Sequence, residues 1–141
     1  MMKKFFFAAI IAAMTFAFTS CNENGSDDPL VGTWKEVNNY TGGSRSELIL
    51  KLTADKHFNF SNGLYMADGS THVYTEYEGT YFVEGNIVTI HYERMVKAIN
   101  YDDSGRTYPF DEKFRYEIDG KTLKVTWIGD GVEWTDEFTK Q

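Results

Sequence analysis

The chain has 141 residues, with 14 Lys and Arg against 21 Asp and Glu, and a formal net charge of −7 at pH 7. Nucleic acid repels a protein of this charge, so we expect no nucleic-acid partner. A single cysteine excludes an intramolecular disulfide, so the folded part must rely on a hydrophobic core alone.

The first twenty residues predict a secretory signal. Lysines at positions 3 and 4 precede an apolar run over residues 5–18, and two small residues stand directly before Cys21. This order of charged, apolar and small residues is typical of an export signal. The apolar run is shorter than the about 20 residues that a membrane-spanning helix needs. We therefore expect residues 1–20 to be a cleaved signal peptide.

The residues around Cys21 resemble the signal of bacterial lipoproteins, in which the cysteine becomes the first mature residue and carries the lipid. Phe18 stands where that family prefers leucine and Ser20 where it prefers glycine or alanine, a departure that fits the looser signals of Bacteroides-like bacteria. The resemblance implies that Cys21 carries fatty-acyl chains such as palmitate, and that the protein is an outer-membrane lipoprotein of a bacterial cell envelope. The alternative is an ordinary signal peptide followed by a reactive thiol or one half of an intermolecular disulfide.

Residues 21–29, CNENGSDDP, predict a flexible acidic tether after the lipidated cysteine, because they contain too little apolar surface to fold. Acidic residues directly after such a cysteine resemble the surface-export tags of Bacteroides-like lipoproteins, which implies display on the cell surface. The alternative is a solvated linker that leaves the domain on the periplasmic face.

Residues 30–141 predict one all-β domain. Apolar and polar residues alternate with a period of two, turn residues interrupt the pattern, and helical spacing is nowhere sustained. We predict eight strands, at about 31–39, 46–53, 57–61, 70–83, 86–100, 112–118, 121–128 and 132–139.

Three two-residue links predict the register of three hairpins, because Asp-Gly and Gly-Asn pairs favour tight turns. In each hairpin, apolar residues then face apolar residues, which a slip by one residue would destroy. The predicted cross-strand pairs are Tyr116–Leu123 and Phe114–Val125 about Asp119-Gly120, Tyr81–Ile90 and Val83–Val88 about Gly85-Asn86, and Trp127–Trp134 and Leu123–Phe138 about Asp130-Gly131.

The apolar positions of the eight strands fall on one face of the predicted sheet. No helix is available to cover this face, so the sheet must curl onto itself, which also removes its edges. We therefore predict a small eight-stranded up-and-down barrel. The predicted interior comprises Leu30, Trp34, Leu48, Leu50, Leu52, Phe58, Phe60, Tyr77, Tyr81, Val83, Val88, Ile90, Tyr92, Phe114, Tyr116, Ile118, Leu123, Val125, Trp127, Val132, Trp134 and Phe138.

Residues 29–141 resemble the lipocalin-like lipoproteins of Bacteroides-like bacteria. Gly32-Thr33-Trp34 matches the Gly-x-Trp element that opens lipocalin-like barrels, and YEGTYFVEGNIVTI and YEIDGKTLKVTW resemble their strand-turn-strand units. The resemblance implies that Trp34 plugs the closed end of the barrel. The chain lacks the helix that follows the barrel in full-size lipocalins, and it has no cysteine pair.

The predicted interior carries polar groups that suit an amphipathic ligand. Eight strands leave room for a filled core or for one small ligand, and a bound ligand needs a cavity above about 300 Å³. Asp136 faces inward opposite Val125, where a carboxylate needs the barrel mouth, a partner or a ligand. The candidate ligand-binding residues are Tyr77, Tyr81, Tyr92, Tyr116, Trp127, Trp134 and Asp136.

No motif predicts catalysis or a cofactor. The histidines (His57, His72, His91) lack the spacing of a zinc site, the acidic run at 101–106 lacks that of a calcium loop, and no nucleophile motif is present. We therefore expect no catalytic residue and no metal.

Three functions remain open. The first is the binding of a small hydrophobic or amphipathic ligand, with the long loops at 62–69 and 101–111 acting as recognition elements or as lids. The second is a solid-core module that contacts an envelope protein or glycan through its loops or through an outward patch of Phe82, Ile49 and Ile128. The third is an enzyme, for which Asp136 is the only candidate.

Overall fold

A computed structural model describes residues 27–129 and 131–141. The predicted signal peptide, Cys21 and most of the tether lie outside the described residues, so the predictions made for them stay predictions.

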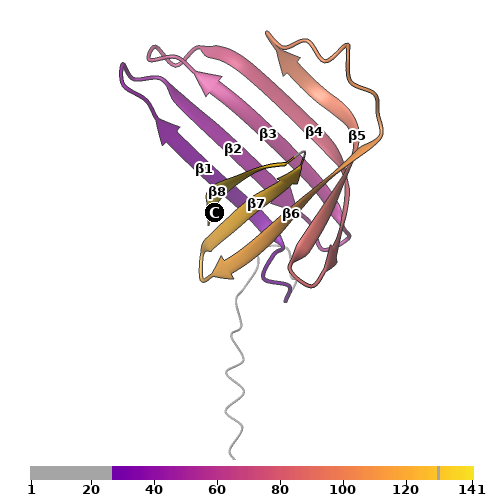
Figure 1. Cartoon of the computed structure of the whole chain (residues 1–141). Coiled ribbons are helices and arrows are strands. Elements are labelled where there is room, and N and C mark those ends of the chain that lie inside the picture. The colour runs from indigo at the N-terminus through magenta and orange to yellow at the C-terminus, as the bar shows by residue number, and fades with distance from the viewer. Residues whose placement is uncertain (1–26, 130) are drawn as a thin grey trace, which may run out of the picture.

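Eight antiparallel strands form a closed barrel, in which each strand pairs with its neighbours in chain order and β8 returns to β1 (Figure 1). The all-β, eight-stranded up-and-down barrel predicted from the sequence is therefore confirmed. The strands are β1 (Gly32–Asn39), β2 (Arg45–Leu52), β3 (His57–Tyr65), β4 (Thr71–Glu84), β5 (Ile87–Ile99), β6 (Phe110–Asp119), β7 (Thr122–Gly129) and β8 (Val132–Lys140).

Two of the three predicted hairpin registers are confirmed, and the third is wrong by two residues. The β4–β5 and β7–β8 pairs occur as predicted, including Val125 opposite Asp136. In β6–β7, however, Tyr116 faces Val125 instead of Leu123. Gly120 has a positive φ of 58° and takes the first central position of the turn, where glycine is favoured, so the turn lies one residue later than predicted. A shift by two residues leaves every side chain on its predicted face.

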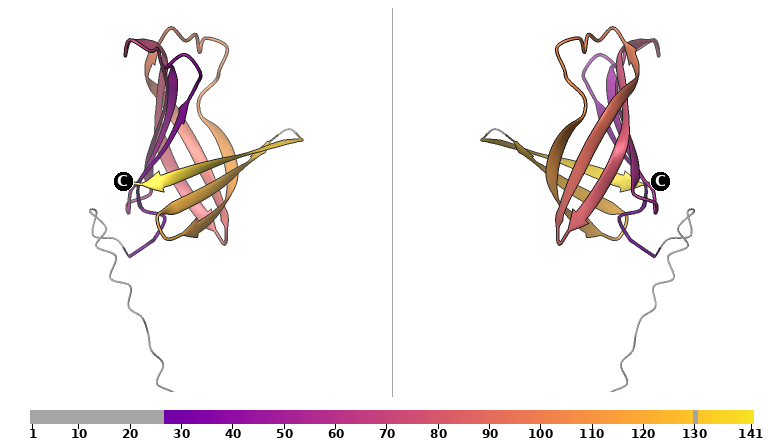
Figure 2. Two further views of the ribbon diagram at one scale, coloured as in Figure 1. Left: turned by 90° about the vertical axis from the view of Figure 1, so that its left-hand side faces the viewer. Right: turned by 90° about the vertical axis from the view of Figure 1, so that its right-hand side faces the viewer.

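The interior of the barrel is an aromatic and aliphatic core. Fifteen side chains form one buried cluster: Leu30, Trp34, Leu50, Leu52, Phe58, Tyr77, Tyr81, Val88, Ile90, Tyr92, Phe114, Leu123, Val125, Trp127 and Phe138. Two residues predicted to be inside are not, because Val132 and Trp134 are 65% and 51% exposed. Both lie near the tip of the β7–β8 hairpin, which projects away from the barrel (Figure 2).

Two β-bulges bend the β4–β5 ladder. Tyr92 faces Gly79 while Arg94 faces Glu78, which leaves Glu93 as an extra residue, and a second shift makes Val96 extra. Each extra residue reverses the alternation of inward and outward side chains and increases the local bend. Met95 therefore packs against the core although simple alternation from Tyr92 would place it outside.

The two ends of the barrel differ. The β1–β2 and β3–β4 turns and the β5–β6 connection gather at one end, while the described segment that leads into β1 lies at the other (Figure 1). The first half of the predicted loop at 62–69 is strand, because β3 continues to Tyr65 and only a short turn separates it from β4. We call the first end the open end and the second the closed end.

Candidate ligand-binding site

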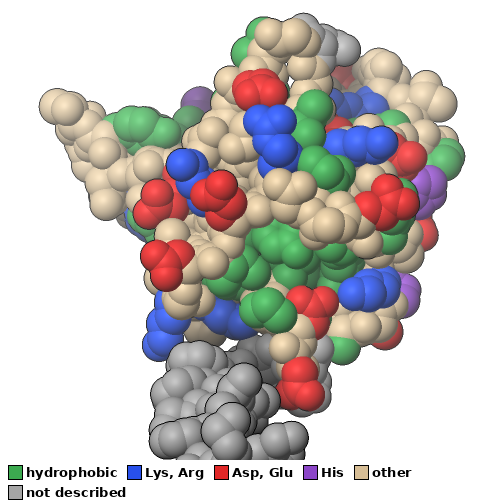
Figure 3. Space-filling model, turned by 60° about the horizontal axis from the view of Figure 1, so that its bottom comes forward, with side chains coloured by type: hydrophobic (Ala, Val, Ile, Leu, Met, Phe, Trp, Pro, Cys, Tyr) green, Lys and Arg blue, Asp and Glu red, His purple; other side chains and the backbone are tan. Residues whose placement is uncertain are grey.

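The closed end is filled by packed side chains. Trp34 is fully buried and its indole Nε1 donates a hydrogen bond to the Leu30 carbonyl oxygen at 2.8 Å, while Lys140 Nζ lies 5.1 Å from the centre of its ring. Seen from this end, hydrophobic side chains gather at the centre of the surface within a ring of acidic and basic ones (Figure 3). Trp34 therefore lies buried at the closed end, as expected of a side chain that plugs it.

Two of the predicted ligand-binding tyrosines belong to the closed end. The Tyr81 hydroxyl donates to the Thr53 carbonyl oxygen at 2.7 Å, and the Tyr116 hydroxyl lies 3.4 Å from the Gly85 carbonyl oxygen. Burial, with smaller contributions from nearby carboxylates, raises the pKa of Tyr81 to about 12. These hydroxyls are used within the turns of the closed end, so the four predicted tyrosines do not form one ring.

The other two predicted tyrosines, Tyr77 and Tyr92, line a cavity at the open end. Its volume is about 200 Å³. The sequence pattern did not single out most of the polar residues that surround it. The lining consists of Phe60, Asn62, Thr75, Tyr77, Tyr92, Tyr101, Arg106 and Glu112.

Aromatic rings form the apolar part of this cavity. Tyr92 stacks on Phe110 with ring centres 4.5 Å apart and planes 7° apart, and it meets Tyr77 edge-on at 5.6 Å. Phe58 packs edge-on against the buried side of Tyr92 at 5.1 Å. Such edge-on and stacked contacts hold the rings in fixed positions, so the floor of the cavity is preformed.

Arg106 brings a positive charge to the rim of the cavity. Its guanidinium lies 4.7 Å from the centre of the Phe110 ring and pairs with Asp103 at 3.7 Å. The Tyr108 hydroxyl donates to the same Asp103 carboxylate, which orders the 101–109 loop around the arginine. The guanidinium is partly exposed, so it still has donors to offer to a ligand.

The hydroxyls of Tyr77 and Tyr92 stay neutral at physiological pH. Burial, helped by the neighbouring Glu112 carboxylate, raises the pKa of Tyr92 well above its ordinary value. Burial and the nearby Tyr101 raise the pKa of Tyr77 in the same direction. The cavity therefore presents phenol donors, one guanidinium and one carboxylate above an aromatic floor.

A second hollow of about 330 Å³ adjoins the cavity. It shares Asn62, Thr75 and Tyr101 with the cavity and adds apolar and hydroxyl-bearing residues from the β1–β2 turn and from β2, β3 and β4. Tyr101, which is 43% exposed, thus borders both spaces. The residues that it adds are Tyr40, Ser46, Leu64 and Val73.

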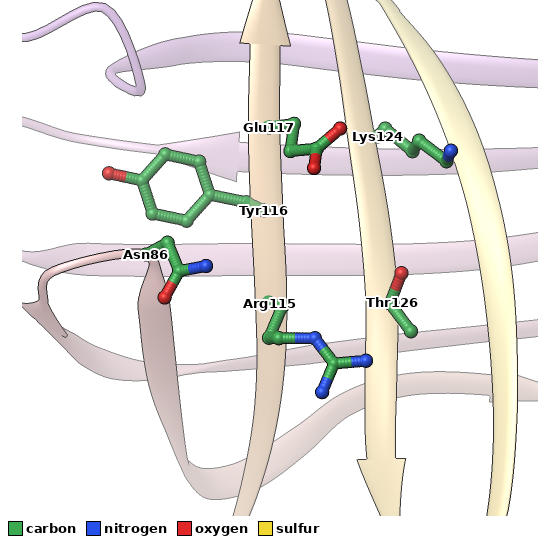
Figure 4. Close-up of a pocket in the computed structure, with 6 residues that line it drawn as sticks. All are labelled: Asn86, Arg115, Tyr116, Glu117, Lys124 and Thr126. Atoms are coloured by element: carbon green, nitrogen blue, oxygen red, sulfur yellow. The ribbon is translucent and has the colours of Figure 1, made fainter.

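A third depression, of about 180 Å³, lies near the closed end against the outer face of β6 and β7. Arg115, Glu117, Lys124 and Thr126 line it, together with Asn86 and Tyr116 (Figure 4). Arg115 pairs with Glu133 at 3.1 Å, and Glu117 lies opposite Lys124 in the ladder. Its basic groups face acidic ones, so it has no excess charge with which to attract an ion.

Of the remaining predicted residues, Trp134 and Asp136 lie on β8, and Trp127 lies opposite Trp134 on β7. Asp136 accepts a hydrogen bond from the Trp127 indole Nε1 at 2.8 Å, and Trp134 stacks on Trp127 with ring centres 6.2 Å apart. Trp127 reaches toward the cavity only through its contact with Phe60 at 6.1 Å. The structure thus divides the seven candidates among three places: the cavity, the closed end and the β7–β8 hairpin.

The predicted outward patch is not one surface. Ile49, Phe82 and Ile128 lie on β2, β4 and β7, which are not neighbouring strands, and none of the three faces another across a ladder. Phe82 and Ile128 are exposed, whereas Ile49 is half-buried.

His57 and His91 point outward as predicted, and each lies beside a carboxylate, Asp55 at 3.1 Å and Asp111 at 2.7 Å. Within residues 27–129 and 131–141, no group of three or more His, Cys, Asp or Glu side chains is arranged to hold a metal ion. In the same part of the chain, no helix has the length and the apolar character needed to cross a membrane.

No protein-family model matches the chain, and no curated protein matches its sequence. The structure, an eight-stranded antiparallel closed barrel, is consistent with a lipocalin-like fold.

Sequence reasoning missed four residues of the cavity: Asn62, Thr75, Tyr101 and Glu112. The sequence places Asn62 in the predicted loop at 62–69, and its pattern does not distinguish Glu112 from the other acidic residues. The only available signal was Tyr101, an aromatic residue at the start of a long polar connection that also contains Arg106.

Proposed function

We propose that this protein is an envelope-anchored lipoprotein of the lipocalin-like kind, whose barrel binds a small hydrophobic or amphipathic ligand without catalysis. The observation that carries the proposal is the cavity at the open end, where an aromatic floor meets Arg106 and Glu112. An apolar floor with few polar groups at its rim is the usual composition of a small-molecule site.

The size of the site favours a ligand that extends beyond the tyrosine-lined cavity. That cavity, at about 200 Å³, is smaller than the about 300 Å³ expected of a typical ligand pocket. The neighbouring hollow of about 330 Å³ shares three lining residues with it. We propose that an apolar group occupies the cavity, and that the rest of the ligand passes Tyr101 into the second hollow.

The charges at the rim favour an anionic or carbonyl-bearing head group. Arg106 supplies a partly exposed cation, and Tyr77 and Tyr101 supply hydroxyl donors beside it. A guanidinium that lies on an aromatic face is well placed for a planar anionic group.

The lipid anchor would turn this site away from the membrane. The described chain begins at the closed end, so acylation at Cys21 would tether the barrel by that end and leave the open end facing outward. Two or more acyl chains hold a protein firmly to a bilayer, whereas one holds it only marginally. Metabolic labelling with radioactive palmitate tests this part, and a Cys21→Ala variant that still acquires label would refute it.

The binding site is tested with 1-anilinonaphthalene-8-sulfonate, an aromatic probe with one anionic group. We expect one probe per barrel, and about tenfold weaker binding to the Arg106→Gln variant, because the variant loses the only cation among the described residues that line the cavity. Arg94→Gln is the matched control, since Arg94 lies on β5 and pairs with Glu78 instead. Equal affinity of the two variants would place the probe elsewhere and refute the site.

A further inference from the structure

The first and last strands of the barrel pair along only a short part of their length. β1 pairs with β8 only at Trp34–Lys140 and Lys35–Thr139. Toward its N-terminal end β8 leaves β1 and continues as one side of the projecting β7–β8 hairpin (Figure 2). Within residues 27–129 and 131–141, no strand pairs with the outer edge of β8 from Val132 to Phe138.

The ladder shows which backbone groups this edge presents. The Lys140 N–H donates to the Lys121 carbonyl oxygen on the β7 side, whereas the Gln141 N–H donates to the Thr33 carbonyl oxygen on the β1 side. Because direction alternates along a strand, the N–H and C=O groups of Glu133, Thr135 and Glu137 also point away from β7. The Glu137 N–H lies near the Glu36 carboxyl group, and those of Glu133 and Thr135 remain available.

The side chains next to these groups combine apolar surface with negative charge. Val132, Trp134 and Asp136 share one face of β8, and the first two are largely exposed. Asp136 accepts from the Trp127 indole but has no cation beside it among the described ion pairs. Edge strands are usually protected by lysine, proline or a covering segment, and residues 132–138 contain neither of the first two.

Glu36 adds a second carboxyl group at the point where the strands separate. Its Oε1 accepts from the Asn38 amide at 3.3 Å, while its buried Oε2 has no hydrogen-bond partner within the described chain. Burial raises the pKa of Glu36, and the nearby Asp136 adds to this effect. Two acidic side chains therefore meet here without a compensating base.

We propose that the outer edge of β8, Val132–Glu137, binds an extended segment of a partner protein that carries a basic residue and apolar residues at alternating positions. The segment adds a strand to the sheet, through main-chain hydrogen bonds to Glu133 and Thr135. Its apolar side chains cover Val132 and Trp134, and its lysine or arginine lies between Asp136 and Glu36. An antiparallel segment then reads basic-x-apolar-x-apolar, because residues two apart share a face.

Charge decides against a second copy of this chain as the occupant. Another molecule would present the same acidic β8 edge, and the whole chain carries a net charge of −7. A basic partner segment instead neutralises the Glu36 and Asp136 carboxyl groups, which form no ion pair with a base within residues 27–129 and 131–141.

The test uses a fluorescein-labelled peptide with the sequence Lys-Thr-Val-Thr-Val-Thr, followed by anisotropy against the purified protein. We expect saturable binding that weakens at least tenfold when alternate backbone nitrogens of the peptide are methylated, because methylation removes the donors but keeps the charge. Equal binding of the methylated peptide would show charge attraction alone, and the absence of any binding to the parent peptide would equally overturn the proposal.

Two variants of one residue locate the site on the protein. Thr135→Pro removes an N–H that points away from β7, a position where an edge strand tolerates proline, and we expect at least a tenfold loss of peptide affinity. Thr135→Val keeps the N–H and should bind as the wild type does. If Thr135→Pro does not fold, the methylated peptide still decides the question with the unaltered protein.

Sedimentation velocity tests whether a second copy of this chain occupies the β8 edge instead. The proposal expects a monomer before the peptide is added. A wild-type dimer that Thr135→Pro dissociates would mean that a second copy occupies the edge, and would overturn it.

Discussion

The β4–β5 and β1–β8 strand pairs of this barrel differ greatly in the length of their ladders. The β4–β5 ladder runs from Tyr74–Ile99 to Glu84–Ile87, and it accommodates two bulges without interruption. The β1–β8 ladder ends after two residue pairs, at the place where the Glu36 and Asp136 carboxyl groups come together.

The difference shows what closes a small barrel. A tight turn joins β4 to β5, and the apolar pairs Val83–Val88 and Tyr81–Ile90 follow it, so each added pair extends an ordered ladder. No turn joins β1 to β8, and the pairing is held by the buried Trp34 at one end only. Where facing carboxyl groups replace apolar pairs, the main-chain ladder stops.

The largest effect is expected from truncating Trp34, which supports the short β1–β8 pairing. Trp34→Ala empties a fully buried site beneath β1, and we expect a loss of about 3–5 kcal/mol in the free energy of unfolding. This is a large share of the stability of a domain of this size. Urea unfolding followed by circular dichroism measures it.

Trp134→Ala is the matched control for this change, because the same side chain is removed from an exposed position on the same seam. It should cost no more than about 1 kcal/mol. Similar losses for the two variants would contradict the assignment of Trp34 as the residue that closes the barrel.

The stability of the β4–β5 pair is tested at Gly79, which lies beside a bulge. A Cβ at Gly79 would collide with the His91 backbone carbonyl oxygen and press on Phe58, so Gly79→Ala should destabilise the protein by about 3 kcal/mol. Gly129→Ala, where a Cβ would meet open space, should leave the thermal unfolding midpoint within a few degrees of wild type. A neutral Gly79→Ala would mean that the two strands separate easily at this point.

The smallest expected effect is a gain in stability at Glu36, where β1 and β8 separate. Burial and Asp136 raise the pKa of Glu36, so folding favours its protonated form, and stability falls as pH rises from the ordinary pKa through the raised one. Glu36→Gln removes that penalty and should stabilise the protein at pH 7 by a few tenths to about 1 kcal/mol.

The pH dependence provides the check on this last prediction. Urea unfolding at pH 7 and pH 3.5 should show the advantage of Glu36→Gln at the higher pH only. The exposed Glu84→Gln serves as the control and should show no such difference. An advantage that is equal at both pH values would mean that ionisation of Glu36 is not the cause.

Much of the fold was predictable because its signals are local. The Gly85-Asn86 and Asp130-Gly131 turns, together with apolar alternation, correctly paired Val83 with Val88 and Trp127 with Trp134. The β6–β7 register was wrong by two residues, since Asp119-Gly120-Lys121 contains two adjacent places for a two-residue turn and apolar pairs form in either register.

The candidate site was predictable only in part. Tyr77 and Tyr92 were placed correctly inside, but the bulges at Glu93 and Val96 change which residues face inward, as Met95 shows. Tyr81 and Tyr116 share the inward face with them, yet their hydroxyls are used by turns at the opposite end. Height along the barrel axis depends on how the strands stagger, and periodicity contains no information about it.

By itself, the sequence determined that this chain is an all-β barrel, because period-two alternation and glycine turns act between residues that are near in the chain. Only the tertiary structure decided where β8 leaves β1, that Arg106 and Tyr101 border the same cavity as Tyr77, and that Trp134 stays exposed. These outcomes depend on contacts between residues far apart in the chain, which no local pattern encodes.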